Sequence, residues 1–191
     1  MTTIAAVQGP SWAVVGFDAQ VSEMDGRKYQ LPDDAAKCFE IGKYVIGVAG
    51  DFRIVNILSH SFSPPDPPDV VGPKLDKFMV TRFIPVVKKS LDNNFYGRDG
   101  KEDGALLIVI VNGIVYEIGP AFDCIRDTKG LYAIGSGGNF ALGALYVLDD
   151  QQTRRSMKRA EEMVSAAMFA AASLDSATSE PITLITRKWE Q

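Results

Sequence analysis

A threonine stands directly behind the first methionine of this 191-residue chain, and a threonine in that position could do chemistry. Its hydroxyl is almost never ionised at neutral pH, so a nucleophilic threonine needs a base within hydrogen-bond reach. A free α-amino group, with a reference pKa of about 7.7 to 8.0, is such a base, whereas a lysine amine has a pKa of about 10.4. Met1 keeps the nitrogen of Thr2 in a non-basic amide. From these residues alone two interpretations stay open: Met1 is a minimal removable prosegment in front of a nucleophilic Thr2, or Met-Thr is the start that many ordinary proteins share.

Other nucleophiles have weaker support in the sequence. A Ser-His-Asp triad would have to use His60, the only histidine, which lies beside the proline-rich stretch 63–69 and which we expect in a surface loop. A Gly-x-Ser-x-Gly motif is absent. A Cys-His pair built on Cys38 or Cys124 would need the same histidine. Both cysteines have apolar surroundings in the sequence, which favours reduced and inert thiols. No metal-ligand spacing is present, so we expect neither a metal nor another cofactor.

The composition excludes several classes of protein. With 46% hydrophobic and 23% charged residues, the chain has the make-up of a single globular domain with a full core. Its formal charge of −4 is opposite in sign to the surface of a typical nucleic-acid-binding protein. Two basic pairs, 154–155 and 158–159, lie among acidic residues and are interpreted as a solvated helix face. The apolar runs fall short of the roughly 20 residues that cross a bilayer, and the N-terminus lacks the features of a signal peptide. We expect a cytoplasmic protein without nucleic-acid or membrane partners.

Hydrophobic periodicity predicts the elements that must position any site. Alternation predicts two hairpins, formed by strands 3–7 with 12–18 and 38–41 with 44–49. Asn112-Gly113 predicts a third hairpin between strands 105–111 and 114–118. Apolar residues spaced three to four positions apart predict four helices, over 51–59, 74–93, 140–148 and 157–174. Further alternation predicts two more strands, over 132–134 and 182–187. The helix over 74–93 is expected to face the core with Phe78, Phe83, Ile84, Val87 and Leu91.

The order of these elements predicts the fold class. Strands, two helices, strands, two helices and a final strand do not suggest a parallel doubly wound sheet. We expect an α+β protein with a four-layer αββα sandwich, in which two antiparallel sheets lie between helix pairs.

Five short blocks of sequence carry a resemblance to a known family. They are Met-Thr-Thr-Ile at 1–4, Phe-Asp-Ala-Gln-Val-Ser at 17–22, Lys-Cys-Phe-Glu-Ile at 37–41, Val-Ile-Gly-Val-Ala-Gly at 45–50 and Ala-Ile-Gly-Ser-Gly-Gly-Asn-Phe-Ala at 133–141. Their order and spacing resemble those of proteasome β-type subunits. The block at 133–138 and the short segment before Thr2 resemble the HslV-type threonine peptidases most. The resemblance covers nearly the whole chain and implies the N-terminal nucleophile (Ntn) hydrolase fold as a single domain over 1–191.

The resemblance implies a role for each matching catalytic residue. Mature Thr2 would be nucleophile through its hydroxyl and base through its amine. Asp18 matches the buried aspartate of the family and Lys37 its active-site lysine; such an ammonium would lower the pKa values of the Thr2 hydroxyl and amine. Ser136 matches the serine near the N-terminal amine. Gly50 matches the glycine whose backbone N–H points at the developing oxyanion.

Further positions complete the site that the resemblance implies. Asp175 and Thr178 match an Asp-x-x-Ser arrangement, with a threonine in place of the serine. Val21 and Ser22 match residues that line the substrate channel, where an extended peptide would add as a strand. Val48 would form the floor of the specificity pocket, which suggests cleavage after apolar residues of medium size.

The implied function is hydrolysis of peptide bonds in unfolded polypeptides. The implied partners are further copies of the chain, in a ring homo-oligomer, and an AAA+ ATPase unfoldase. The chain departs from the family pattern by three extra residues between Asp18 and Lys37 and by the proline-rich stretch 63–69 after a short helix. Two alternatives therefore stay open: a catalytically inactive, ring-forming scaffold subunit of the same fold, and an Ntn amidase that acts on a small molecule.

Overall fold

Strand β1 (Thr3–Gln8) shows why the chain folds into layers. Successive side chains of a strand point to opposite faces of its sheet. Ile4 and Ala6 pack into one hydrophobic core, whereas Ala5 and Val7 pack into another, and all four are fully buried. A strand that is apolar on both faces needs a layer of structure on each side.

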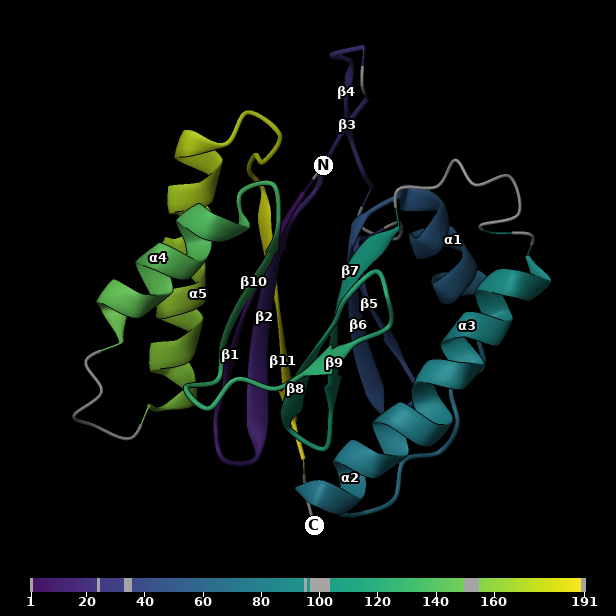
Figure 1. Ribbon diagram of the computed structural model, residues 1–191. Coiled ribbons are helices and arrows are strands. Elements are labelled where there is room, and N and C mark those ends of the chain that lie inside the picture. Colours follow the sequence, from purple (N-terminus) through teal and green to yellow (C-terminus); the bar gives the residue numbers. More distant parts are fainter. Residues whose placement is uncertain are drawn as a thin grey trace.

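The strands form two main antiparallel sheets in the computed structural model, which describes residues 2–23, 25–32, 36–94, 96, 104–149 and 155–189 (Figure 1). The strands are β1, β2 (Trp12–Asp18), β3 (Gln20–Ser22), β4 (Lys28–Gln30), β5 (Cys38–Ile41), β6 (Tyr44–Gly50), β7 (Ala105–Val111), β8 (Ile114–Ile118), β9 (Cys124–Ile125), β10 (Leu131–Gly135) and β11 (Ile182–Lys188). One sheet has the order β10-β1-β2-β11 and the other β5-β6-β7-β8-β9, and β3 pairs with β4 in a separate ribbon.

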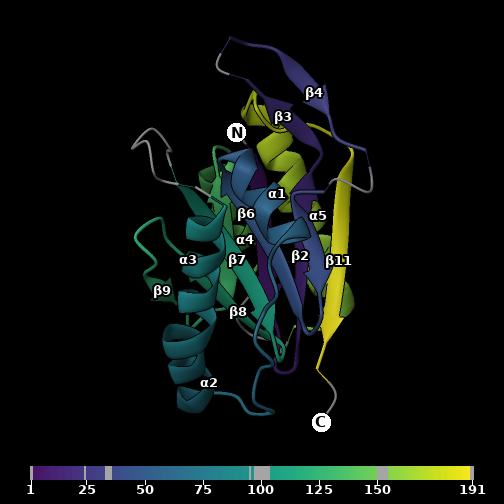
Figure 2. The same cartoon turned by 90° about the vertical axis from the view of Figure 1, so that its right-hand side faces the viewer.

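Helices cover the outer face of each sheet (Figures 1 and 2). They are α1 (Phe52–His60), α2 (Pro73–Phe78), a π-helical turn (Met79–Phe83), α3 (Ile84–Asn93), α4 (Gly138–Leu148) and α5 (Met157–Leu174). Helices α4 and α5 pack on the four-stranded sheet, and α1 to α3 pack on the five-stranded sheet. The predicted α+β, four-layer αββα sandwich is confirmed. Among the helices of the described residues, none combines the length and apolar character that a membrane crossing requires.

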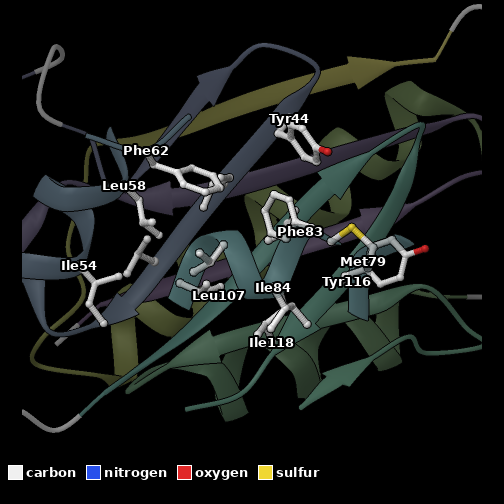
Figure 3. Close-up of a cluster of buried hydrophobic side chains, with 14 of the residues drawn as sticks. Tyr44, Ile54, Leu58, Phe62, Met79, Phe83, Ile84, Leu107, Tyr116 and Ile118 are labelled. Carbon is white, nitrogen blue, oxygen red and sulfur yellow. The ribbon is translucent and has the colours of Figure 1, made fainter. Parts of the chain in front are cut away.

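The largest buried side chains lie between the five-stranded sheet and helices α1 to α3 (Figure 3). The rings of Tyr44 and Phe83 stack with their centroids 4.9 Å apart, and Phe62 meets Phe83 edge-on at 5.7 Å. Such aromatic pairs add to the stabilisation that burial of apolar area already provides. Phe83, from the π-helical turn, thus joins the sheet to the helical layer.

The three predicted hairpins are confirmed. β1 pairs with β2, β5 with β6 and β7 with β8, all antiparallel. Asn112 and Gly113 have φ angles of 50° and 71°, which is the combination that a tight two-residue hairpin turn requires. The short strands β3, β4 and β9 were not expected, because two or three residues are too few to show alternation.

The long helix expected over 74–93 is interrupted by the π-helical turn. Pro85 has no N–H to donate to the carbonyl of Thr81, and a proline ring collides with the carbonyl four residues earlier. The backbone N–H of Ile84 instead donates to the carbonyl of Met79, five residues back. Met79 is fully buried, whereas Phe78, which was expected in the core, is only partly buried.

Of the basic pairs 154–155 and 158–159, Arg154 lies outside the described residues, and the prediction of a solvated helix face is wrong for Arg155. Its guanidinium donates to the two carboxylate oxygens of Asp149 at 2.7 and 2.8 Å and to the carbonyl of Lys129 at 2.7 Å. Bidentate pairs of this kind are among the strong hydrogen bonds of proteins. Arg155 therefore ties the segment before α5 to the end of α4. Arg159 does form an exposed pair, with Glu162.

Replacing Gly16 by alanine is expected to lower the free energy of unfolding by about 1–3 kcal/mol. An added Cβ would lie 2.5 Å from Cγ1 of Val164 on α5 and 2.9 Å from Leu184 on β11. Gly143→Ala in α4 is the matched control, because nothing lies within 4 Å of its added Cβ. Urea denaturation of both variants measures the difference. Equal stabilities would contradict the close packing of α5 on β2.

Candidate active site

Antiparallel pairing brings Thr2 and Asp18 together. Thr2 immediately precedes β1, and Asp18 is the last residue of β2. Ile4 pairs with Phe17 in the register of these strands, so the start of β1 lies beside the end of β2. The Thr2 hydroxyl donates to Oδ1 of Asp18 at 2.7 Å, and both residues are buried.

Asp18 is a fully buried carboxylate that accepts hydrogen bonds from four groups. Besides the Thr2 hydroxyl, Oδ1 accepts the backbone N–H of Thr3 at 3.1 Å and Nζ of Lys37 at 2.8 Å. Oδ2 accepts the backbone N–H of Gln20 at 3.1 Å. A buried charge is tolerated only when it is paired and hydrogen-bonded in this way.

Lys37 reaches the same point from the segment before β5, in the other sheet. Its ammonium donates both to the Thr2 hydroxyl and to Asp18, and its carbonyl accepts the N–H of Val48 at 3.0 Å, which fixes the segment to β6. Burial lowers the pKa of Lys37 below that of an ordinary lysine, although Asp18 opposes this effect. The arrangement places a desolvated cation against a hydroxyl, where it can stabilise an alkoxide.

A second polar group adjoins the backbone of Thr2 on its other side. The N–H of Ser136 donates to the Thr2 carbonyl at 2.8 Å. Gly135, with φ of 94°, allows this approach, because a Cβ there would lie 1.9 Å from that carbonyl oxygen. The hydroxyls of Ser136 and Thr178 each donate to Oδ2 of Asp175 at 2.7 Å. The structure thus brings together three further residues that the sequence singled out.

Asp175 is held in its ionised form by these donors. Burial raises its pKa, but hydrogen bonds from Thr178, Ser136 and the N–H of Ala177 more than offset burial, so the net pKa is below the usual value. Its own N–H ends α5 by donating to the carbonyl of Ala171 at 2.8 Å. A negative charge is therefore fixed next to Ser136.

Gly50 ends β6 in a backbone conformation that side chains rarely adopt. Its φ is 131°, and an added Cβ would lie 2.7 Å from the carbonyl oxygen of Gly104. Both observations explain why glycine stands here. That its N–H serves as an oxyanion donor stays a prediction.

The three predicted substrate-binding residues lie in two different environments. Val21 and Ser22 are half-buried on β3, and the β3–β4 ribbon projects from the sandwich near the N-terminus (Figure 1). Val48 is 2% exposed and packs in the core below α1 to α3. The structure does not bring Val48 to an open surface, and its role in specificity stays a prediction.

A hollow of about 300 Å³ is lined by residues of β5, α1 and β11, and no sequence pattern predicted it. Its lining includes Ala36, Phe39, Phe52, Asn56 and His60. His60 is the last residue of α1, so the expectation that it lies in a loop is wrong, although it is exposed as expected. A hollow formed by a strand edge and a helix face has no local sequence signal.

The cysteines do not form an alternative nucleophile. Both are free, and Cys38 is 2% exposed. Burial raises the pKa of the Cys38 thiol well above that of a free thiol, and burial raises the pKa of Cys124 to about 11. A thiol that stays protonated is a poor nucleophile.

Thr3 and Gln20 also belong to the site, although the sequence did not single them out. Thr3 bridges to Thr178 through their hydroxyls, 2.6 Å apart. The amide of Gln20 donates to the carbonyl of Ser176 at 3.1 Å and to the hydroxyl of Ser22 at 2.9 Å. For Thr3 the available signal was a polar side chain in the predicted strand 3–7; Gln20 lay outside every predicted strand and had no such signal.

The chain is similar to known proteins over nearly its whole length. The ATP-dependent protease subunit HslV of Pediococcus pentosaceus is 28% identical to the chain over 192 residues, which cover 99% of the chain and 96% of that relative. The chain is thus similar to HslV along nearly its whole length. No protein-family model matches it.

Solved structures of HslV and of a further protein share the fold. Thiobacillus denitrificans BPH in complex with epoxomicin superposes with a TM-score of 0.77 at 19% identity and covers 100% of both chains. Eukaryotic HslV from Trypanosoma brucei superposes with a TM-score of 0.69 at 24% identity and covers 98% of this chain and 99% of its own. These matches establish the Ntn-hydrolase fold, which was predicted from the five sequence blocks.

Replacing Lys37 by methionine is expected to cost about 3–5 kcal/mol of unfolding free energy, because it leaves Asp18 as a buried charge without its cation. The control is Arg27→Met, which breaks the exposed pair of Arg27 with Asp25 and is expected to cost at most about 1 kcal/mol. Urea denaturation at neutral pH compares the two. A Lys37→Met variant as stable as the control would contradict the paired, buried site.

Proposed function

We propose that this chain is a threonine-type endopeptidase that hydrolyses peptide bonds in unfolded polypeptides, with Thr2 as its N-terminal nucleophile after removal of Met1. The observation that carries the proposal is the contact of the Lys37 ammonium with both the Thr2 hydroxyl and Asp18 in a buried site. The similarity to HslV, a protease subunit by name, supports it.

The reaction follows from these groups. The free amine of Thr2 takes the hydroxyl proton while the oxygen attacks the scissile carbonyl carbon, and Lys37 stabilises the developing alkoxide. The carbonyl oxygen becomes an oxyanion, for which the N–H of Gly50 is the proposed donor. The amine then gives its proton to the leaving nitrogen as the C–N bond breaks. Water attacks the resulting ester through the same base and releases Thr2.

The assembly is part of the proposal. We infer a ring homo-oligomer with the sites inside, located in the cytoplasm and supplied with polypeptide by an AAA+ ATPase unfoldase. The relative's description as a subunit of an ATP-dependent protease supports this inference. Native mass spectrometry gives the number of subunits, and an excess of monomer at micromolar concentration would count against it.

Thr2→Ala is expected to abolish hydrolysis of fluorogenic peptides, because no other hydroxyl is bound to both Lys37 and Asp18 in the described residues. Thr2→Ser keeps the hydroxyl and should retain a measurable fraction of the rate. Intact mass of the wild type should lack one methionine residue. The epoxyketone epoxomicin should label the wild-type peptide that begins at residue 2 and leave the Thr2→Ala variant unlabelled.

Two results would contradict the proposal. Protein that retains Met1, cleaves no peptide and resists epoxomicin would favour a scaffold subunit without activity. Hydrolysis of small amides without hydrolysis of peptides would favour an amidase. Native mass spectra of the wild type and the Thr2→Ala variant should be alike, which separates a lost nucleophile from a lost assembly.

The dependence of kcat on pH should show a basic limb below the value of about 10.4 for an ordinary lysine. Burial lowers the pKa of Lys37, so its ammonium is lost as the pH rises through that lowered value. Activity that needs the cation is therefore present at lower pH and declines as the pH rises. The profile should be recorded on protein that remains folded at each pH. A rate that stays flat to pH values above that of a free lysine would show that the charge of Lys37 is not required.

A further inference from the structure

Thr3 connects the two polar groups on either side of Thr2. Its side chain is fully buried, and its backbone N–H donates to Oδ1 of Asp18 at 3.1 Å. Its hydroxyl oxygen lies 2.6 Å from that of Thr178. One residue thus contacts the carboxylate that holds Lys37 and the hydroxyl that holds Asp175.

The direction of the hydrogen bonds follows from counting protons. A threonine hydroxyl has a single proton. Thr178 gives its proton to Oδ2 of Asp175 at 2.7 Å, so in the 2.6 Å contact Thr3 is the donor and Thr178 the acceptor. The chain therefore runs from Thr3 through Thr178 to Asp175, a carboxylate that the Ser136 hydroxyl also contacts at 2.7 Å. Hydrogen bonds in such chains strengthen one another.

Ser136 ends this network beside Thr2. Its single proton goes to the Asp175 carboxylate, the shorter of its two contacts; the other is 3.4 Å, to the carbonyl of Thr2. The Ser136 oxygen therefore keeps its lone pairs for a donor on residue 2. The orientation of the Ser136 hydroxyl therefore depends on the position of Asp175. Asp175 is in turn bound by Thr178, and Thr178 by Thr3.

Gly137 leaves the space that the Thr3 hydroxyl occupies. Its φ and ψ of −87° and 4° are open to any residue, so backbone conformation does not require a glycine. An added Cβ would, however, lie 2.2 Å from Oγ1 of Thr3 and 3.0 Å from Oγ1 of Thr178. A glycine at the start of α4 therefore leaves room for the hydroxyls of Thr3 and Thr178.

We propose that Thr3 is a positioning residue for the reaction of Thr2, because its hydroxyl fixes Thr178, Asp175 and Ser136 relative to Asp18. The inference rests on the proposed function. A hydroxyl that served the fold alone would be replaceable by any group of equal size, provided that the protein remained folded.

Thr3→Val removes the hydroxyl at nearly constant side-chain volume. We expect it to lower kcat at least about fivefold and to change KM less than twofold, because misplaced catalytic groups slow the chemical step. Thr3→Ser restores the donor and should return kcat to within about twofold of wild type. Thr186→Val is the matched control on strand β11, since it removes an exposed hydroxyl that donates to Glu161 at 2.9 Å. Thermal unfolding of each variant verifies the fold.

Gly137→Ala perturbs the same contact from the opposite side and replaces Thr3→Val if that variant does not fold. Equal kcat values for Thr3→Val and Thr186→Val would overturn the inference and leave the proposed function intact. A Thr3→Ser variant as slow as Thr3→Val would also overturn it, since the donor would then not be what matters. Wild-type protein that neither turns over peptide nor reacts with epoxomicin would remove both the inference and the proposed function.

Discussion

The ion pair between Lys37 and Asp18 is the interaction on which the site depends. Their side chains are 3% and 0% exposed, and neither charge would be stable there alone. Asp18 is satisfied by four donors, and Lys37 by Asp18 and the Thr2 hydroxyl. The Thr2 hydroxyl is consequently held between a cation and an anion. The Thr2 side chain, which could otherwise populate several rotamers, is thereby held in one position where proton transfer is possible.

The sandwich makes this burial possible because it brings strand ends of the two sheets together at the pair. Asp18 ends β2 of the four-stranded sheet and Thr2 directly precedes β1 of that sheet, whereas Lys37 precedes β5, the edge strand of the five-stranded sheet. Gly47 allows the close approach, since an added Cβ would lie 2.7 Å from Sγ of Cys38 and 3.2 Å from Ile4. The helical layers then bury the outer faces. The site is a product of long-range packing rather than of one local motif.

The sequence predicted what depends on local pattern or on the resemblance. Alternation and the Asn112-Gly113 turn predicted the hairpins, and the order of five blocks placed Asp18, Lys37 and Ser136 in one site. The bridge between Thr3 and Thr178 could not be predicted in this way, because 175 residues separate the two neutral hydroxyls and neither leaves a pattern. The pairing of Arg155 with Asp149 was missed for a different reason. Both residues lie in a run of mixed charges, and such a run has the same sequence pattern whether its side chains are solvated or paired.

The similarity to HslV and the geometry around Thr2 both support the proposal of a threonine peptidase. The most direct test is a crystal structure of protein whose chain begins at Thr2, solved after incubation with epoxomicin. The account predicts a covalent bond from Oγ1 of Thr2 to the reagent, with Nζ of Lys37 and Oγ of Ser136 within hydrogen-bond distance of residue 2. A reagent bound to another residue, or a Lys37 side chain turned away from Thr2, would contradict it.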